Sequence, residues 1–283
     1  MGMQSFVLIL LYSIWVLPAH ALQCGQSLAS QESGAGLQEL AWKALLSGDQ
    51  ASSQKREAQI LESFRHPEEI IEMIPFDAST SDIFDVQFKN GLKAIFKPNP
   101  EFWKDARKAK KQGFTANPIA EVDAYRISVL LELGLVPVAL EVEVSGMKGT
   151  LHAAVHSLWE EPMLGQNVLK LFSYLINNRD VGSRNTLNIE GRAISIDHGL
   201  SFLPHQFHGL SAFYWDPSIK FTKDTQVFLK NLKIKLSPDR IRQMLEGRHS
   251  AQVIEELIQR RDIILQKARA FLAKIYMGKN SAA

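Results

Sequence analysis

The sequence lacks disulfide capacity, strong net charge and any hydrophobic run long enough to span a membrane. Cys24 is the only cysteine among the 283 residues, so an internal disulfide is impossible. The 32 Lys and Arg residues nearly balance the 30 Asp and Glu residues, and a formal net charge of +2 provides no strong field for nucleic acid or an anionic membrane. With 46% hydrophobic and 22% charged residues, the chain can bury a core and does not have the composition of a disordered protein. The composition therefore excludes a disulfide scaffold and gives no support to nucleic-acid binding.

The first residues have the pattern of a secretory signal peptide. An almost continuous apolar run covers residues 6–17, and Ala19-His20-Ala21 provides the small residues of a cleavage site. The run is shorter than the roughly 20 residues of a spanning helix, which favours a cleaved signal peptide over residues 1–21 rather than an uncleaved membrane anchor. An exported chain without disulfides is typical of bacteria, so we expect a bacterial protein that is periplasmic or secreted, with no integral membrane segment after signal removal. Alternatively, Cys24, which lies just after this segment, could be lipidated.

The centre of the sequence carries three polar residues at a spacing that suits phosphoryl transfer. Asp180 is followed by Asn185 five residues later and by Asp197 twelve residues after that, with a β-like run between them. Phosphoryl transfer requires neutralised phosphate oxygens and an in-line hydroxyl, so hard oxygen ligands and one hydrogen-bond acceptor suffice. Protein kinases use a catalytic-loop Asp, an Asn five residues later and the Asp of an Asp-Phe-Gly turn. The pattern therefore predicts that Asp180 orients a hydroxyl and that Asn185 and Asp197 hold magnesium.

A predicted β-hairpin upstream places a lysine where a kinase would use one. Residues 84–88 and 92–97 are alternating runs joined by an Asn90-Gly91 turn. The second run ends in Ala-Ile-Phe-Lys97, which is very like the Val-Ala-Ile-Lys strand of kinases. We therefore predict that Lys97 contacts the phosphates of a nucleotide.

A periodic helix over residues 121–134 offers an acidic partner for this lysine. Kinases hold the lysine with a glutamate on a helix, and Glu121 opens the predicted helix here. Four apolar residues of the helix can share one face: Val122, Tyr125, Val129 and Leu133. Glu121 is the first choice as the partner of Lys97. The alternative is that Glu121 only favours the helix dipole and that Asp123 competes for the pairing.

The remaining segments predict helices at both ends of the chain and further strands between them. Helices are expected over 36–46, 52–64, 166–176, 216–232, 237–245 and 250–277, with one or two helical turns over 67–74. Strands are expected over 137–144 and 150–158, and the segment 157–161 is the expected hinge between two lobes.

Three stretches, residues 121–137, 178–185 and 196–202, resemble those of atypical kinases with reduced large lobes. This PI3/4-kinase-like group includes type II phosphatidylinositol 4-kinases, secretory-pathway kinases that phosphorylate casein-like substrates, and HipA-type kinases. The resemblance implies an α+β fold with two lobes, in which a small β-rich lobe precedes a reduced helical lobe. The corresponding divisions are a signal peptide over 1–21, a helical extension over 22–75, a small lobe over 76–160 and a large lobe over 161–283.

Carried over to this sequence, the resemblance implies a role for each of five residues. Lys97 would contact the nucleotide phosphates, Glu121 would be its partner and Asp180 would be the catalytic base. Asn185 and Asp197 would hold Mg²⁺ or Mn²⁺. The cofactors implied are ATP and this divalent cation.

Two features depart from the kinase pattern. No glycine-rich loop precedes the hairpin, so the segment 77–82 would have to cover the phosphates through Ser, Thr and backbone donors. Asn178 replaces the His that usually stands two residues before the catalytic Asp.

We therefore expect an exported, ATP- and magnesium-dependent kinase that transfers the γ-phosphoryl group to a hydroxyl. The expected acceptor is a lipid head group, such as a phosphoinositide, or a protein. The sequence does not choose between these and a small molecule, because acceptor contacts lie on loops without a readable code. The missing glycine-rich loop favours one alternative, a catalytically inactive kinase-like binding module. A second alternative is adenylyl transfer with ATP bound in the reversed orientation.

Overall fold

The computed structural model describes the chain from residue 36 to residue 280 with several gaps. The described residues are 36–76, 82–102, 117–155, 165–178, 180, 185–189, 191–204 and 219–280, with side chains described up to residue 271. The chain divides into two units, Met1–Gln31 and Glu32–Ala283, and every described residue belongs to the second unit. The expected signal peptide, the expected hinge at 157–161 and all but Asp82 of the expected phosphate-covering segment lie outside the described residues. Within the described part of the chain, no helix has the length and apolar character needed to cross a membrane.

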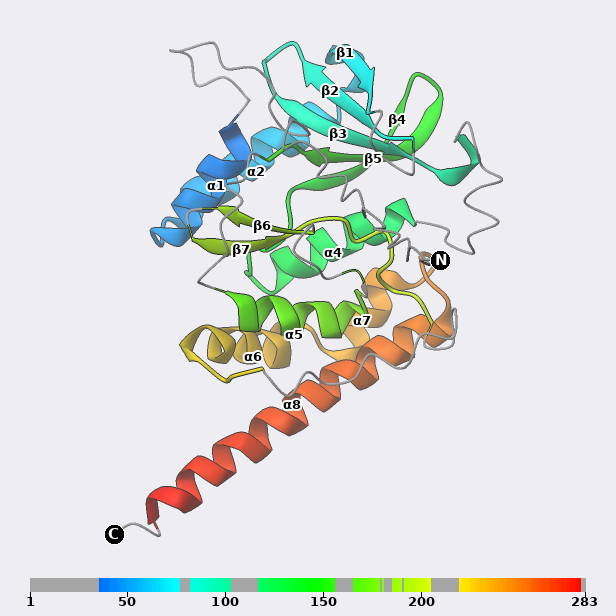
Figure 1. Cartoon of the computed structure of the whole chain (residues 1–283). Helices are drawn as coiled ribbons and strands as arrows, with labels where there is room; N and C mark the ends of the chain where they lie inside the picture. The colour runs from blue at the N-terminus through cyan, green and yellow to red at the C-terminus, as the bar shows by residue number, and fades with distance from the viewer. Residues whose placement is uncertain are drawn as a thin grey trace, which may run out of the picture. The chain divides into compact units, whose positions relative to one another are not determined.

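A five-stranded antiparallel sheet forms the β-rich part of the fold (Figure 1). Its strands, in the spatial order β1-β2-β3-β5-β4, are β1 (Ile70–Pro75), β2 (Phe84–Phe88), β3 (Lys93–Pro98), β5 (Met147–Ala153) and β4 (Ala139–Val144). The hairpin predicted from the Asn90-Gly91 turn is confirmed, because β2 pairs with β3 and Gly91 has a φ of 83°. The Asn90 side chain accepts a hydrogen bond of 3.0 Å from the Leu92 N–H and closes the turn.

The helical turns expected over 67–74 are wrong for most of that segment. A short 3₁₀ helix, η3, covers Pro67–Glu69, and the chain then enters strand β1. β1 is rich in isoleucine, which favours strands, and its pairing with β2 satisfies backbone groups that a helix of this length would leave exposed. Pro75 ends β1 at the edge of the sheet, where a missing N–H is tolerated.

Helix α4 (Pro118–Leu130) lies between the sheet and the helices of the C-terminal half (Figure 1). It begins one turn earlier than predicted, because the Asn117 side chain accepts a 3.1 Å bond from the Ile119 N–H and Pro118 fits the first turn. The helix ends at Leu130, earlier than predicted, so of the predicted apolar face only Val122 and Tyr125 are buried on α4; Leu133 is buried beyond its end and Val129 is 46% exposed. α4 instead buries residues on most of its circumference, including two carboxylates, Glu121 and Asp123.

The N-terminal helices α1 (Leu37–Leu46) and α2 (Gln50–Phe64) pack on two different parts of the fold. Phe64 of α2 stacks on Phe88 of the sheet with ring centroids 5.9 Å apart. Trp42 of α1 belongs instead to a small apolar cluster with residues of a second, two-stranded sheet. These strands are β6 (Thr186–Ile189) and β7 (Arg192–Ser195). The two helices therefore connect the five-stranded sheet with the hairpin that precedes Asp197.

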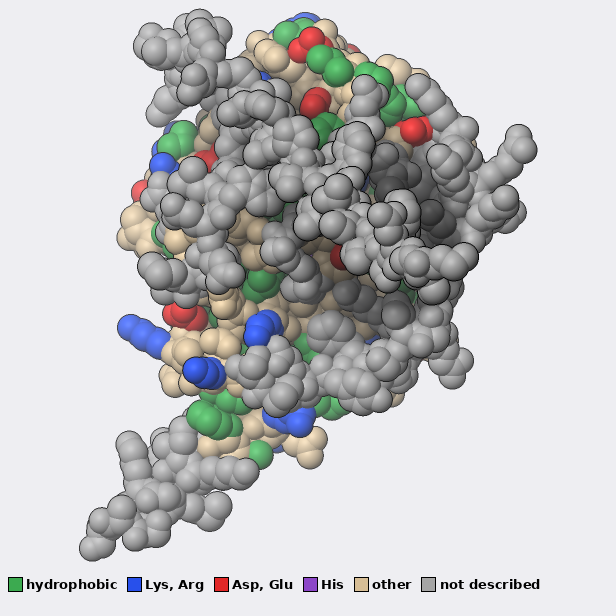
Figure 2. All heavy atoms as spheres, viewed as in Figure 1, with side chains coloured by type: hydrophobic (Ala, Val, Ile, Leu, Met, Phe, Trp, Pro, Cys, Tyr) green, Lys and Arg blue, Asp and Glu red, His purple; other side chains and the backbone are tan. Residues whose placement is uncertain are grey.

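Four α-helices and a short 3₁₀ helix, η4 (Pro100–Phe102), complete the described chain. The α-helices are α5 (Gln166–Ile176), α6 (Lys223–Lys235), α7 (Pro238–Leu245) and α8 (Ala251–Asn280). α5 has the predicted bounds, and it packs against β7, α6 and α8. Ser237 and Ser250 cap the N-termini of α7 and α8, since their hydroxyls accept from the N–H groups of Arg240 (3.2 Å) and Val253 (3.3 Å). On the face drawn in Figure 2, the described basic side chains lie apart from one another rather than in one continuous patch. The mixed α+β class predicted from the sequence is thus found.

Candidate functional site

Three charged side chains from distant parts of the chain meet at the end of strand β3. The Lys97 Nζ donates to Glu121 Oε1 at 2.6 Å and to Asp197 Oδ1 at 3.0 Å. Glu121 lies on α4, and Asp197 follows strand β7 after a separation of 100 residues from Lys97. The structure therefore brings the predicted phosphate lysine together with its predicted partner and with one predicted magnesium ligand.

The position of Lys97 follows from the alternation and close packing of strand β3. Phe96 and Pro98 are buried on one face, so Lys97 faces the opposite side, toward α4. Lys97 pairs with Thr150 on β5, next to Gly149. A Cβ at Gly149 would lie 2.4 Å from the Lys97 carbonyl oxygen, so only glycine allows the two strands to approach this closely.

The three charges stabilise one another's ionised forms. Burial alone would raise the pKa of the Glu121 carboxyl, but Lys97 and the neighbouring histidines hold it well below the ordinary value. Burial opposes the charge on Lys97, but Glu121 and Asp197 raise the pKa of its ammonium group above the ordinary value. The lysine is therefore a permanent cation in this site, as phosphate binding requires. Asp197, whose side chain is 52% exposed, remains accessible from solvent.

The second oxygen of Glu121 holds the turn that carries Asp197. Glu121 Oε2 accepts a bond of 2.8 Å from the backbone N–H of His198, and His198 Nδ1 lies 3.3 Å from the same oxygen. The ring of this fully buried histidine also contacts Ser195 Oγ through Nε2 at 2.9 Å. Asp197 has a φ of 57°, a left-handed conformation that is uncommon outside glycine and is fixed here by these contacts. Sequence reasoning missed His198, although a polar residue in place of the apolar one in Asp-Phe-Gly was a visible signal.

Asp180 and Asn185 are joined through backbone groups. Asn185 Nδ2 donates to the Asp180 carbonyl at 2.8 Å, and the Asn185 carbonyl accepts from the Ile196 N–H at 3.0 Å. Asn178 Oδ1 accepts from the Asp180 N–H at 3.1 Å, so Asn178 supports the loop in which kinases have histidine. Within the described residues, no hydrogen bond or ion pair connects the exposed carboxylate of Asp180 to Lys97. The connection between the two groups runs through Asn185 and the residue before Asp197.

The alternative partner for Lys97 is engaged elsewhere. Asp123 accepts from Arg248 Nε at 2.9 and 3.1 Å, on the opposite side of α4 from Glu121's contacts with β3. It also contacts His249 Nε2 at 2.9 Å. Glu121 and Asp123 thus have separate partners.

The residues present fit a magnesium–nucleotide complex better than a metal held by protein alone. In the part of the chain that the structure describes, no group of three or more His, Cys, Asp or Glu side chains is arranged to hold a metal ion. Magnesium in phosphoryl-transfer sites is bound by one or two protein groups together with phosphate oxygens and water. Asp197 has a half-exposed carboxylate. Asn185 uses its Nδ2, not its amide oxygen, in the bond to Asp180. These two oxygen groups match that requirement.

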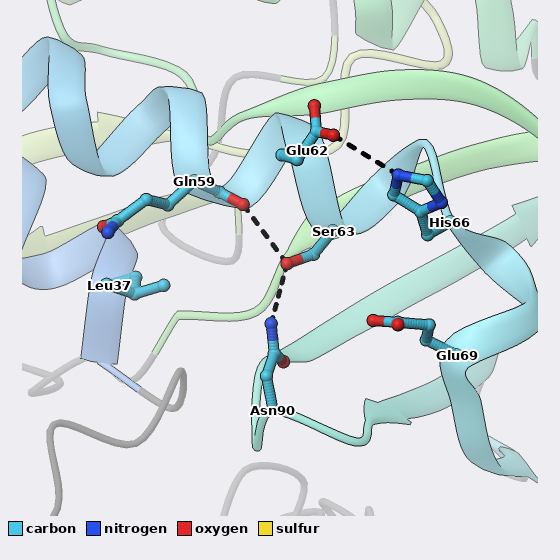
Figure 3. A pocket seen from close by; sticks show the side chains of 7 residues that line it. All are labelled: Leu37, Gln59, Glu62, Ser63, His66, Glu69 and Asn90. Atoms are coloured by element: carbon cyan, nitrogen blue, oxygen red, sulfur yellow. Dashed lines mark hydrogen bonds and ion pairs between the residues drawn. The ribbon is translucent and has the colours of Figure 1, made fainter.

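Two cavities among the described residues lie away from Lys97. One, of about 410 Å³, is bordered by α1, α2, η3 and the β2–β3 turn (Figure 3). Two of the polar side chains that line it are hydrogen-bonded to each other: Asn90 Nδ2 donates to Ser63 Oγ at 2.8 Å. The Ser63 hydroxyl in turn donates to the Gln59 carbonyl at 3.2 Å. The other, of about 250 Å³, has Arg192 and Phe228 in its lining. Neither cavity includes Lys97, Glu121 or Asp197.

His152 on strand β5 adds a titratable group to the charged cluster. Its Nε2 lies 2.8 Å from Thr150 Oγ1. Burial is the main cause that lowers the pKa of His152 from 6.5 to about 4, and the favourable field of Glu121 is too weak to reverse it. The imidazole is therefore neutral in the folded protein at neutral pH.

We expect the free energy of unfolding to decrease as the pH falls from about 6.5 toward about 4, because unfolded His152 takes up a proton that the folded protein excludes. At pH 5 this difference amounts to about 2 kcal/mol, from 1.36 kcal/mol per pKa unit. Above about pH 4.5 Glu121 adds little to this effect, since a carboxyl with a depressed pKa loses its stabilising effect mainly below its unfolded value of 4.5. Urea unfolding of the wild type and of His152→Gln at pH 7 and pH 5 should show a smaller pH effect in the variant. Parallel losses in both proteins would contradict this origin.

Comparisons with known proteins give matches among solved structures but none by sequence. No protein-family model matches the sequence, and no curated protein is significantly similar to it. Among solved structures, the chain is similar to the crystal structure of the Golgi casein kinase, with a TM-score of 0.48 and 12% sequence identity. The similarity covers 75% of this chain and 76% of that chain. A similarity of this extent says nothing about activity or substrate.

Proposed function

We propose that this chain is an ATP- and magnesium-dependent kinase that transfers the γ-phosphoryl group to a hydroxyl of a lipid head group or a protein. The observation that supports the proposal most is the contact of Lys97 with both Glu121 (2.6 Å) and Asp197 (3.0 Å). A strand lysine paired with a helix glutamate, beside the acidic residue of the magnesium turn, is the arrangement by which kinases hold nucleotide phosphates. A scaffold would have no use for a partly buried cation beside an exposed carboxylate at this point.

Each residue of the site would have a distinct task in this reaction. Lys97, fixed by Glu121, would neutralise charge on the nucleotide phosphates, and Asp197 with Asn185 would hold the divalent cation. The cation, when bound, neutralises charge that develops on the transferred phosphoryl group. Asp180 would accept the proton of the acceptor hydroxyl, and its exposed side chain allows an acceptor to approach. We further propose that the protein is exported from a bacterial cell after removal of residues 1–21.

Replacing Asp197 with alanine is expected to weaken magnesium-dependent ATP binding at least about tenfold, or about 1.4 kcal/mol, since one of two protein ligands is lost. Thermal-shift titrations of the chain from Leu22 onward with ATP, in magnesium and in EDTA, measure this loss. Asp239→Ala is a matched control, because Asp239 is 96% exposed on α7 and distant in sequence from the site. Equal ATP affinity in wild type and Asp197→Ala would remove Asp197 from the proposed site.

The acceptor class is tested with labelled nucleotide. The chain from Leu22 onward is incubated with γ-labelled ATP, magnesium, and either phosphoinositide vesicles or a whole-cell protein extract. Transfer of label to lipid or to protein supports the kinase proposal and identifies the acceptor class. Transfer from α-labelled but not γ-labelled ATP supports adenylyl transfer instead. ATP binding without either transfer favours the inactive binding module, and absence of ATP binding contradicts the proposal.

A further inference from the structure

A buried ionic cluster fixes helix α4 to the turn between α7 and α8. Asp123 on α4 is completely buried, and Arg248 Nε donates to its two oxygens at 2.9 and 3.1 Å. His249 Nε2 lies 2.9 Å from Asp123 Oδ2. The residues that meet are about 125 positions apart in sequence. The turn is shaped by Gly247, whose φ of 75° is readily adopted only by glycine.

Arg248 joins a third element to this cluster. Its Nη2 donates to Glu141 on β4, so one guanidinium connects α4, the five-stranded sheet and the α7–α8 turn. The side chain of Arg248 is 20% exposed and that of Glu141 is 40% exposed, whereas Asp123 is shielded from water. A carboxylate in such surroundings is tolerated only while its cationic partners remain in place. The cluster is therefore a rigid connection rather than a solvated surface pair.

The same cluster contacts two segments next to residues of the proposed nucleotide site. Asp123 is two residues from Glu121 on α4, so a displacement of this turn of the helix would also displace the partner of Lys97. His249 stacks on Phe202 with ring centroids 4.9 Å apart. Phe202 follows Asp197 by five residues, has a φ of 57° and donates its N–H to the Ile176 carbonyl at 2.8 Å. The cluster thus contacts the helix that carries Glu121 and the segment that follows Asp197.

We propose that Arg248 is a positioning residue which, through Asp123 and Glu141, holds helix α4 in the register that pairs Glu121 with Lys97. Arg248 does not touch the proposed nucleotide site and acts on it through α4. The expected effect on ATP rests on the proposed function, but the effect on α4 does not. Because the connection is built from buried charges, Glu121 is held in place without a bound partner or a modification.

Amide hydrogen exchange of the chain from Leu22 onward tests the proposal without any ligand. In Arg248→Ala, peptides from α4 (Pro118–Leu130) should exchange at least about tenfold faster than in wild type, because a buried carboxylate has lost its main partner. Peptides from α5 (Gln166–Ile176) should keep their wild-type exchange. Arg248→Lys retains the charge without the fork geometry and should restore part of the protection. In ATP titrations, Arg248→Ala should weaken binding about tenfold in the presence of magnesium.

Arg242→Ala is the matched control, since Arg242 forms an exposed pair with Glu255 at the end of α7, and it should leave exchange in α4 unchanged. If Arg248→Ala does not fold, Arg248→Lys and Glu141→Gln provide the same comparison. Unchanged exchange in α4, or an equal increase in α4 and α5, would overturn the positioning role. If wild type does not bind ATP, the proposed function fails, and the exchange experiment still decides whether Arg248 fixes α4.

Discussion

Replacing Asp180 with asparagine is expected to lower the rate of phosphoryl transfer by about 10²–10⁴-fold while changing ATP affinity by less than about threefold. The rate loss is the usual contribution of a general base, which asparagine cannot provide. The affinity should persist because the proposed function assigns the phosphate and metal contacts to Lys97 and Asp197, which contact each other rather than Asp180. The loop should also persist, since it is held by backbone bonds of Asp180 to Asn178 and Asn185.

The measurement is a single-turnover transfer rate with saturating ATP, beside an ATP titration of the same preparation. Asp239→Asn, which changes an exposed carboxylate on α7, should match wild type in both. A wild-type transfer rate in Asp180→Asn would contradict the role of Asp180 as base. A large loss of ATP affinity in this variant would instead place Asp180 among the groups that bind the nucleotide.

Local patterns in the sequence predicted the elements that carry the site. The hairpin followed from alternation and the Asn90-Gly91 turn, and β2 and β3 lie where these signals put them. Helix α5 followed from the period of its apolar residues. Because these signals are contained within about fifteen residues, the position of Lys97 at the end of β3 could be predicted without knowing what packs against it.

Contacts between distant segments could not be predicted in the same way. The strand β1 replaces the expected helical turns because it pairs with β2. This partner lies further along the chain, so a local pattern over 67–74 could not show the pairing. The bonds of His198 to Glu121 span 77 residues, and those of Arg248 to Asp123 span 125. A sequence shows that a buried carboxylate needs a partner, but which of many Lys, Arg and His residues provides it depends on the tertiary fold.

These long-range contacts give Glu121 more than one task. One oxygen pairs with Lys97 of the sheet and the other accepts from the His198 N–H beside Asp197. A single carboxylate therefore contacts both Lys97 and the turn that carries Asp197. The position of Asp197 should then depend on Glu121, although the two side chains carry charges of the same sign.

Replacing Glu121 with alanine is expected to lower the free energy of unfolding by about 3 kcal/mol at pH 7. The change leaves the His198 N–H without its acceptor and Lys97 without its buried partner. Removing one partner of a buried ion pair destabilises a folded protein by about 3–5 kcal/mol. The lower end applies because Lys97 is 22% exposed and keeps its contact with Asp197.

Urea unfolding measured from neutral pH to below pH 4 tests both the size of this loss and its cause. The depressed pKa of Glu121 stabilises the folded protein above the unfolded value of 4.5, and this contribution disappears as the pH falls through the folded value. The difference between wild type and Glu121→Gln, which retains shape without charge, should therefore shrink below pH 4.5. Glu255→Ala removes an exposed carboxylate from the Arg242 pair and should leave stability unchanged at neutral pH. A pH-independent difference between wild type and Glu121→Gln would mean that packing, rather than the charge of Glu121, fixes the turn that carries Asp197.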